Sequence, residues 1–260
     1  MIKFAARERL THLPDAILFD LDNTLYPYKP AHMAAMAAVR AKVTESLAIT
    51  SADFDRAFKQ ARDLVKKNLS GTAASHNRLL YFQRMLELLG LGSQVLLALD
   101  LEQAYWRNFL SAATLFEGLE EFLDDIRLLG IPTAVVTDLT AQIQFRKILY
   151  FRLDKYFDYI VTSEEAGFDK PHPAIFIMAL AKISPRGKRI WMVGDDPEAD
   201  VRGAKQAIGA LTWQKLHGDA RAGQGPLAPD AGFEEFSELK DFVAGLSEKA
   251  RIEHISSRGR

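Results

Sequence analysis

The sequence contains no cysteine among its 260 residues. This absence excludes disulfide bonds, thiolate metal ligands and a cysteine nucleophile, and it is typical of proteins in a reducing compartment. Neither sign of charge dominates, because 33 Lys and Arg residues stand against 34 Asp and Glu residues, a formal net charge of −1. General binding to nucleic acids or anionic membranes depends on an excess of basic charge, so neither is expected as a partner.

Long hydrophobic runs are also missing. No uninterrupted apolar stretch reaches the roughly 18 residues needed to cross a bilayer. Residues 1–13 include three basic residues but lack the apolar centre of a signal peptide. We therefore expect a cytoplasmic protein. Its composition, 48% hydrophobic and 26% charged, is that of an ordinary globular chain, and its length allows one large domain or two smaller ones.

Short apolar runs that end in turn-forming or polar residues recur along the chain and predict buried strands. They cover residues 16–19, 133–136, 159–161, 189–193 and 210–213. Helical patterns lie between the later runs, at residues 119–129, 140–149, 173–183 and 198–208. Strands that alternate with helices predict a doubly wound, parallel α/β sheet of the Rossmann-like kind.

The segment after the first strand has a different pattern. Residues 30–114 contain no convincing strand but several amphipathic stretches, at 31–47, 51–69, 75–89 and 101–110. We interpret 30–114 as an inserted α-helical cap domain and residues 1–29 and 115–260 as the α/β core. Towards the end, 218–232 is expected to be a loop and 249–260 to be frayed, with a docking helix between them that begins near Phe233.

Carboxylates follow several of the predicted strands. Asp20 and Asp22 come after the first, Asp138 follows Thr137 after the second, and Asp195 and Asp196 come after the fourth. In open α/β sheets ligands bind beyond the carboxyl ends of the strands. Clustered acids repel each other unless a cation neutralises them, and a cluster of oxygen ligands suits Mg²⁺ better than zinc. Lys170, after the third strand, would add positive charge at the same edge.

Taken singly, each of these residues also has a structural interpretation. Residues 22–24 could form a turn or a helix cap, and residues 137–138 could cap the following helix. Lys170 could be a solvated loop charge, and residues 195–200 could be an acidic helix N-terminus. Their joint placement at one sheet edge favours function, because each structural feature would otherwise have to fall there by chance.

The pattern resembles the haloacid dehalogenase (HAD) superfamily of hydrolases. Asp20-Leu21-Asp22-Asn23-Thr24 is similar to the family's DxDxT signature, and the other matches follow in the family's order between Asp15 and Thr212. They are Thr137 at a strand end, Lys170-Pro171 and Gly194-Asp195-Asp196-Pro197-Glu198-Ala199-Asp200. The insert between the first two motifs resembles the cap of one HAD subfamily.

This resemblance implies a Mg²⁺-dependent phosphatase. Asp20 would attack phosphorus and form an aspartyl-phosphate, while Asp22 would protonate the leaving alcohol and then deprotonate water. We expect carboxylate neighbours and partial burial to let Asp22 hold a proton near neutral pH. Mg²⁺ would be bound by Asp20, the backbone carbonyl of Asp22 and Asp195. The phosphoryl oxygens would contact Thr137, Asp138 and Lys170, and Asp196 and Asp200 would position metal-bound water and Lys170.

Within the cap, His76, Arg78 and Tyr81 flank a predicted helix start and are candidate substrate contacts. Alternatively, His76 and Arg78 are surface residues and Tyr81 belongs to the core. The expected substrate is a small phosphorylated metabolite, such as a sugar phosphate or a nucleotide.

A phosphosugar mutase, a haloacid dehalogenase and a non-catalytic regulatory homologue are the alternative functions. The presence of Asp20 together with Asp22, Asp195 and Asp196 argues against the last two. The sequence leaves the oligomeric state open.

Overall fold

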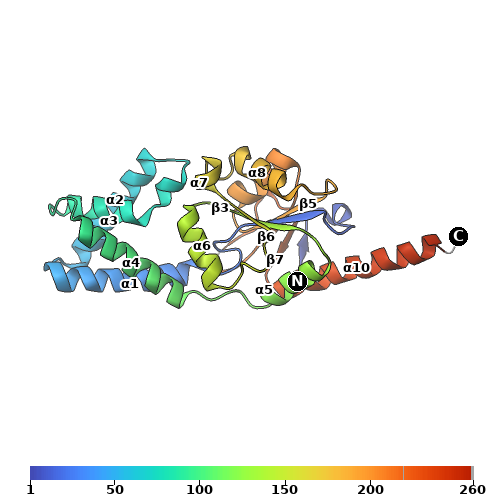
Figure 1. Ribbon diagram of the computed structural model, residues 1–260, viewed down its shortest axis with the longest axis horizontal. Coiled ribbons are helices and arrows are strands. Elements are labelled where there is room, and N and C mark those ends of the chain that lie inside the picture. Colours follow the sequence, from blue (N-terminus) through green and yellow to red (C-terminus); the bar gives the residue numbers. More distant parts are fainter. Residues whose placement is uncertain (219, 259–260) are drawn as a thin grey trace.

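The structure, a computed structural model, describes residues 1–218 and 220–258, with residues 253–258 described by their backbone only. These residues form an α/β core and a helical cap, which lie side by side along the long axis of the molecule (Figure 1). The expected fold class is therefore confirmed. No helix among the described residues is both long enough and apolar enough to cross a membrane.

The core contains a seven-stranded sheet with the strand order β1-β7-β6-β5-β2-β3-β4. Its strands are β1 (Lys3–Phe4), β2 (Ala16–Phe19), β3 (Thr133–Thr137), β4 (Tyr159–Thr162), β5 (Ile190–Gly194), β6 (Leu211–Lys215) and β7 (Ala231–Phe233). All neighbouring strands are parallel except β1, which pairs antiparallel with β7. Strand β2 lies between β3 and β5, so the carboxyl ends of these three strands meet at one edge.

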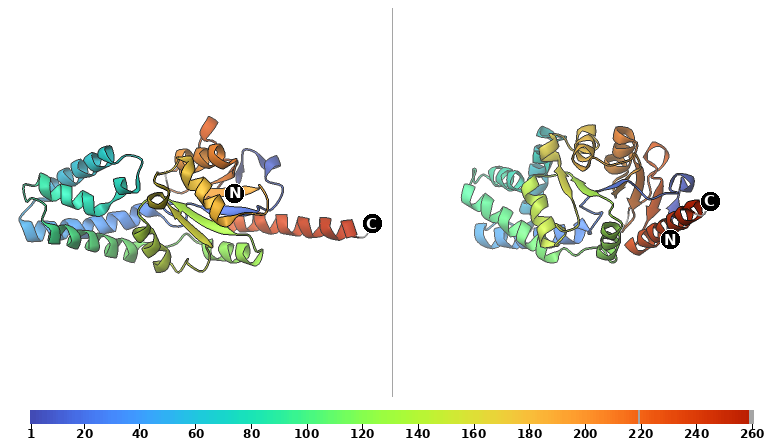
Figure 2. Two further views of the ribbon diagram at one scale, coloured as in Figure 1. Left: turned by 45° about the horizontal axis from the view of Figure 1, so that its top comes forward. Right: turned by 45° about the vertical axis from the view of Figure 1, so that its right-hand side comes forward.

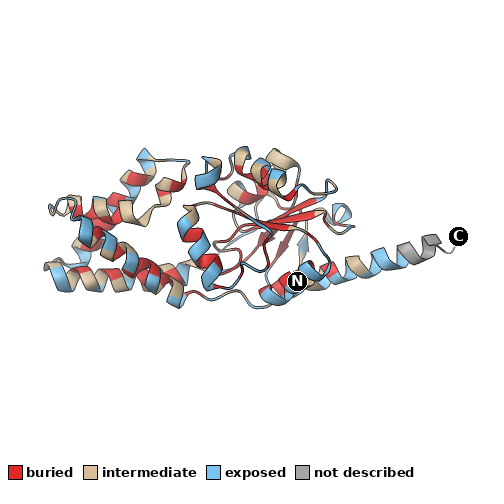
Figure 3. Cartoon of the chain, viewed as in Figure 1, coloured by how far each residue is buried: buried red, intermediate tan, exposed pale blue. Residues whose placement is uncertain are grey.

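The five strands expected from the sequence are present, and their side chains alternate between two apolar layers. Ile17 and Phe19 contribute to one hydrophobic cluster, and Ala16 and Leu18 to the other. Helices cover both faces, so these strands are almost continuously apolar rather than alternating with polar residues. Figure 3 shows buried residues along the strands and on the inner sides of the helices.

The helices of the core alternate with these strands, as the pattern predicts. They are α5 (Leu119–Leu128), α6 (Ala141–Tyr150), α7 (Ser163–Ala166), α8 (Pro173–Ile183), α9 (Gly203–Ile208) and α10 (Phe236–Arg258). Short turns of 3₁₀ helix cover Arg7–Arg9 and Gly225–Leu227, and a π-helical turn over Pro197–Arg202 precedes α9. The helix expected over 198–208 is therefore divided into two parts.

Two expectations for the end of the chain are wrong. Residues 231–233, which were expected to be loop and helix start, form the edge strand β7, because three residues are too few to show a strand period. Helix α10 continues through 249–258 instead of fraying, and it leads away from the cap (Figure 2). Neither Gly nor Pro interrupts residues 246–258 of this helix. Residues 259–260 of the expected frayed tail lie outside the described residues.

The cap is built from helices that pack on one another. They are α1 (Tyr28–Leu47), α2 (Ser51–Asn68), α3 (Arg78–Leu88) and α4 (Val95–Ala112), with a 3₁₀ turn, η2, over Ala73–His76. Helix α1 packs against α4, and α2 packs against α3. The side chain of Asn77 caps α3 by accepting hydrogen bonds from the backbone N–H groups of Leu79 and Leu80.

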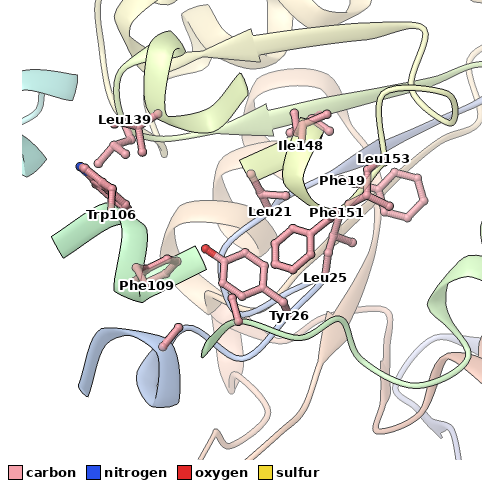
Figure 4. Close-up of a cluster of buried hydrophobic side chains, with 14 of the residues drawn as sticks. Phe19, Leu21, Leu25, Tyr26, Trp106, Phe109, Leu139, Ile148, Phe151 and Leu153 are labelled. Atoms are coloured by element: carbon pink, nitrogen blue, oxygen red, sulfur yellow. The ribbon is translucent and has the colours of Figure 1, made fainter. Parts of the chain in front are cut away.

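A hydrophobic cluster joins the cap to the core. Figure 4 shows Trp106 and Phe109 of the cap helix α4 together with Tyr26 and Phe151 of the core. The ring centroids of Tyr26 and Phe109 lie 6.1 Å apart, and those of Tyr26 and Phe151 lie 5.1 Å apart. This apolar junction places the end of α4 beside the residues that follow β2.

Candidate active site

Asp20 follows β2 at the edge where the carboxyl ends of β2, β3 and β5 meet. The ammonium nitrogen of Lys170 lies 2.6 Å from Asp20 Oδ1 and 2.7 Å from Asp200 Oδ1. It also donates a hydrogen bond to the backbone oxygen of Val136, at 3.1 Å. Residues that are far apart in the sequence thus converge on one site, as the sequence motifs predict.

Lys170 is almost completely buried, with a side-chain exposure of 3%. Burial lowers the pKa of a lysine, but Asp20 and Asp200 outweigh that effect and hold the pKa of Lys170 well above its usual value. The side chain is therefore a permanent cation, and all three of its N–H donors have acceptors.

The carboxylate of Asp20 is held in a fixed orientation by two neighbours. While Lys170 contacts Oδ1, the hydroxyl of Thr24 donates a hydrogen bond of 2.8 Å to Oδ2. Burial raises the pKa of Asp20 to about 7, with Lys170 opposing the shift and Asp200 adding to it. Nucleophilic attack requires the ionised form, so further positive charge near Asp20 would favour its reactive state.

Three carboxylates form a cluster that could hold a metal ion. One oxygen from each of Asp20, Asp195 and Asp200 lies within 4.8 Å of the others. Among the described residues, no group donates a hydrogen bond to the carboxylate of Asp195, and burial beside Asp20 and Asp200 raises its pKa to about 9. The cluster has more negative charge than Lys170 neutralises, and its oxygen ligands suit Mg²⁺. Gly194 permits this packing, because a Cβ there would lie 2.4 Å from the Asp200 carboxyl carbon.

Asp196, which was expected to position metal-bound water, is exposed and caps the π-helical turn that follows β5. Its Oδ1 accepts hydrogen bonds of 2.8 Å from the backbone N–H groups of Glu198 and Ala199. Asp200, in contrast, is buried and accepts hydrogen bonds from Lys170 and from the backbone N–H of Asp196. The geometry thus favours Asp200 over Asp196 as the residue that positions Lys170.

Asp22 has partners that the sequence did not indicate. Both of its carboxylate oxygens accept hydrogen bonds from Lys147 Nζ, at 2.7 and 2.8 Å, and Oδ1 also accepts one from the hydroxyl of Tyr26. Burial alone would raise the pKa of Asp22, but Lys147 and Tyr26 hold it below its usual value. The expectation that its surroundings favour the protonated form is therefore wrong, because the buried cation was not foreseen.

Lys147 of α6 is enclosed at the junction of the cap and the core. Its side chain is 1% exposed, and Nζ lies 5.5–5.9 Å from the ring centroids of Tyr26, Trp106 and Phe109. A signal for this residue was present, because Lys147 lies one helical turn from Ile143 on the buried side of α6. Charged residues are rarely placed there without a partner.

The residues expected to bind phosphate lie beside Asp20. The hydroxyl oxygen of Thr137 accepts a hydrogen bond of 2.5 Å from Gln144, a residue that sequence reasoning missed, and it donates its own proton to the backbone oxygen of Asp138 at 3.4 Å. The carboxylate of Asp138 accepts a hydrogen bond of 2.9 Å from the backbone N–H of Lys170. Burial raises the pKa of Asp138 to about 6.

A cavity of about 470 Å³ lies between this edge and the cap. All three cap candidates line it. His76 also contacts Asp169 of the core at 3.3 Å, and Tyr81 is buried with its hydroxyl bonded to the backbone of Ser75. Arg78 is not the surface residue of the alternative interpretation, since its guanidinium lies 5.2–5.6 Å from the ring centroids of Tyr81, Tyr105 and Trp106.

The parallel sheet, the cap and the clustered carboxylates define a HAD-type hydrolase. In agreement, residues 14–207 match the family of haloacid dehalogenase-like hydrolases, and the chain belongs to this family.

The chain is similar to curated phosphatases. It is 41% identical over 202 residues to ribulose-1,5-bisphosphate 5-phosphatase of Halopiger xanaduensis, covering 76% of this chain and 82% of that protein. It is 28% identical to glyceraldehyde 3-phosphate phosphatase of Methanopyrus kandleri, over 89% of this chain and 98% of that protein. The expectation of an enzyme that hydrolyses phosphoric monoesters is thereby confirmed.

The fold is also similar to that of solved structures. The HAD hydrolase YfnB of Bacillus subtilis superposes with a TM-score of 0.68 at 20% identity, covering 89% of this chain and 99% of that one. This match includes nearly all of the second protein, and it supports the same fold for this chain.

Proposed function

We propose that this protein is a Mg²⁺-dependent phosphatase that hydrolyses a small sugar phosphate through an aspartyl-phosphate on Asp20. The observation that supports it best is the pair of contacts on Asp20, from Lys170 and Thr24, within the carboxylate cluster. The similar proteins of known activity, whose names give ribulose 1,5-bisphosphate and glyceraldehyde 3-phosphate as substrates, support a sugar phosphate.

In the first step, a carboxylate oxygen of Asp20 bonds to phosphorus while the bond from phosphorus to the substrate's ester oxygen breaks. Asp22 gives its proton to that oxygen, so an alcohol leaves. In the second step, Asp22 takes a proton from water, the water oxygen bonds to phosphorus and the bond to Asp20 breaks. Inorganic phosphate is released, and both carboxyl groups return to their starting states.

This role requires Asp22 to change partners. In the structure its carboxylate is bound to Lys147 and Tyr26, which favour the ionised form. To act as an acid, Asp22 must leave these contacts and take up a proton as the substrate enters. The three rings around Lys147 come partly from the cap helix α4, so a cap movement would alter the surroundings of this ion pair.

Asp20, the backbone carbonyl of Asp22 and Asp195 would hold Mg²⁺, with Asp200 and Asp196 around them. The ion would offset the repulsion between the nucleophile and the phosphate dianion and would favour the ionised state of Asp20. This donor set supports a metal because its carboxylates exceed the charge of Lys170.

The phosphoryl oxygens would be bound by donors on two segments, the end of β3 and the loop that contains Lys170. Thr137 would turn its hydroxyl proton from the backbone oxygen of Asp138 to the phosphate, and Lys170 would exchange one of its three present acceptors for a phosphoryl oxygen. Asp138 would contribute its backbone N–H, because an ionised carboxylate accepts hydrogen bonds but does not donate them. The cap, which we propose to span 30–114, would exclude water from the site during the first step.

The decisive experiment follows release of inorganic phosphate from p-nitrophenyl phosphate and from a panel of sugar phosphates, with Mg²⁺ present. We expect turnover by the native protein and a loss of at least about 1,000-fold in Asp20→Asn, a substitution that removes the nucleophile. The matched control is Asp55→Asn, since Asp55 forms an exposed ion pair with Arg40 on the cap. Retained turnover in Asp20→Asn would exclude Asp20 as nucleophile, and isomerised product without released phosphate would indicate a mutase.

A further inference from the structure

The wall of the cavity that is formed by α2 is strongly basic. Lys59, Arg62 and Lys66 line the cavity, and their spacing of three and four residues places them on one face of the helix. The adjacent face of α2, which includes Phe58 and Val65, is buried in the cap. The basic side chains therefore stand at the boundary between the cap's hydrophobic core and the cavity.

Acidic residues neutralise this wall only in part. Asp63 lies 3.7 Å from Lys59 and 3.9 Å from Arg62, so a single carboxylate faces two cations and neither contact is short. Within the described part of the chain, no carboxylate lies within 4 Å of Lys66. Burial lowers the pKa of Lys66, and the neighbouring cations Arg62 and Arg78 lower it further, whereas Asp169 and Asp63 oppose the shift.

A second basic group lies deeper in the same cavity. The guanidinium of Arg78 donates to the hydroxyl of Tyr28 and to the backbone oxygen of His76, both of which are uncharged acceptors. Its Nε is buried and has no hydrogen-bond partner among the described residues. Buried polar groups are rarely left without a hydrogen-bond partner, so an anionic ligand in this cavity would supply the acceptor that Nε lacks.

The cavity thus has two chemically different ends. Asp22 and Asp138 line its core end, whereas Arg62 and Lys66 line it on the cap. Asp20 itself is not a lining residue, but it lies two positions before Asp22 in the chain. A substrate with a single phosphate would satisfy the donors near Asp20 and leave the basic wall without a partner. The cavity has a volume of about 470 Å³, which lies within the range of small-molecule sites, roughly 300–1,000 Å³. It can therefore hold a ligand longer than a single phosphate ester group.

We propose that the basic wall of α2 binds a second phosphate of the substrate, so that the enzyme acts preferentially on sugar bisphosphates. One phosphate would occupy the site at Asp20 while the other lies against Arg62 and Lys66, with Arg78 behind them. This inference rests on the proposed phosphatase function and adds the substrate class. The competing explanation is general attraction, in which the basic wall draws every phosphate ester towards the site without binding a second group.

Binding measurements in an Asp20→Asn background separate these explanations, since the substrate then stays intact. The probes are ribose 1,5-bisphosphate and ribose 5-phosphate, which differ by one phosphate, titrated by calorimetry with Mg²⁺ present. We expect Lys66→Met to weaken binding of the bisphosphate about tenfold and to reduce its advantage over the monophosphate by a similar factor. The matched control is Lys67→Met, because Lys67 is the next residue of α2, is exposed and does not line this cavity.

Arg62→Gln provides an independent variant at an exposed position, and thermal unfolding checks that each variant is folded. An equal loss for both probes in Lys66→Met and Arg62→Gln would overturn the inference in favour of general attraction. No advantage of the bisphosphate in the starting protein would overturn it too. A native protein that turns over no phosphate ester, p-nitrophenyl phosphate included, would instead contradict the proposed function itself.

Discussion

The ammonium group of Lys147 lies 2.7 and 2.8 Å from the two carboxylate oxygens of Asp22, although 125 positions separate the two residues in the sequence. This pair links the proposed acid–base residue to α6 and to the aromatic rings of the cap helix α4. The position of Asp22 therefore depends on the core and on the cap at the same time.

Lys147→Met is expected to reduce both stability and activity. It leaves the Asp22 carboxylate without its buried counter-charge, which costs about 3 kcal/mol of unfolding free energy, and it removes the group that orients Asp22. Urea denaturation and steady-state kinetics measure the two effects. Lys182→Met is the control, because its ion pair with Glu165 is partly exposed to solvent and contributes less than about 1 kcal/mol. Equal effects of the two substitutions would show that the Lys147 pair has no special role.

Thr24→Val is expected to lower kcat by about 10- to 100-fold without unfolding the protein. The substitution keeps the shape of the side chain but removes the hydroxyl that donates to Asp20 Oδ2, and hydrogen bonds to charged groups contribute about 1.5–3 kcal/mol. Thr44→Val removes a hydroxyl that bonds only to the backbone of α1, and it serves as the control. Native kcat in Thr24→Val would mean that Asp20 is oriented by Lys170 alone.

Mg²⁺ is expected to stabilise the metal-free protein as well as to activate it. At a concentration of about 100 times its dissociation constant, a ligand adds about 2.7 kcal/mol, which corresponds to an increase in Tm of about 5 °C or more for a chain of this size. Asp195→Asn should abolish this increase, and chelation should remove activity until Mg²⁺ is restored. Glu198→Gln is the control, since Glu198 forms an exposed ion pair with Arg202. A Tm that is indifferent to Mg²⁺ would contradict the metal site.

His32 predicts that stability decreases in mild acid. Its Nδ1 lies 2.7 Å from the hydroxyl oxygen of Tyr105, and burial together with Arg78 and Arg62 lowers its pKa from 6.5 to about 4. Between these pH values the unfolded chain binds the proton and the folded chain does not, so the free energy of unfolding falls as the pH decreases from about 6.5 to about 4. The slope of unfolding free energy against pH then corresponds to the uptake of up to about one proton on unfolding. His32→Gln should remove this contribution, as measured by urea denaturation at several pH values. His12→Gln, at an exposed position, should keep it.

Much of the core could be predicted because its signals are local. The apolar runs before Asp20, Thr137 and Asp195 are buried strands, and each ends where its functional residue begins. Parallel pairing then brings these ends together without further information. The edge strand β7 and the division of the helix after β5 had no such signal, since both involve only a few residues.

The partners of Asp22 could not be predicted for a different reason. Lys147 and Tyr26 reach this carboxylate only because α6 packs beside the loop after β2, a contact set by tertiary structure. The apolar side of α6 shows that Lys147 is buried but not which acid it meets. Likewise, the spacing on α2 shows that Arg62 and Lys66 share a face, whereas only the fold shows that this face borders the active-site cavity.

The 3.3 Å contact between His76 of the cap and Asp169 of the core lies next to a main-chain bond of 2.9 Å from the Asp169 N–H to the Gly71 oxygen. Asp169 immediately precedes Lys170, whose ammonium group holds the nucleophile. A swing of the cap that separated Gly71 from Asp169 would pull directly on this loop. Opening and closing of the cap would thus be transmitted, through the main chain of Asp169, to the cation that contacts the reacting carboxylate.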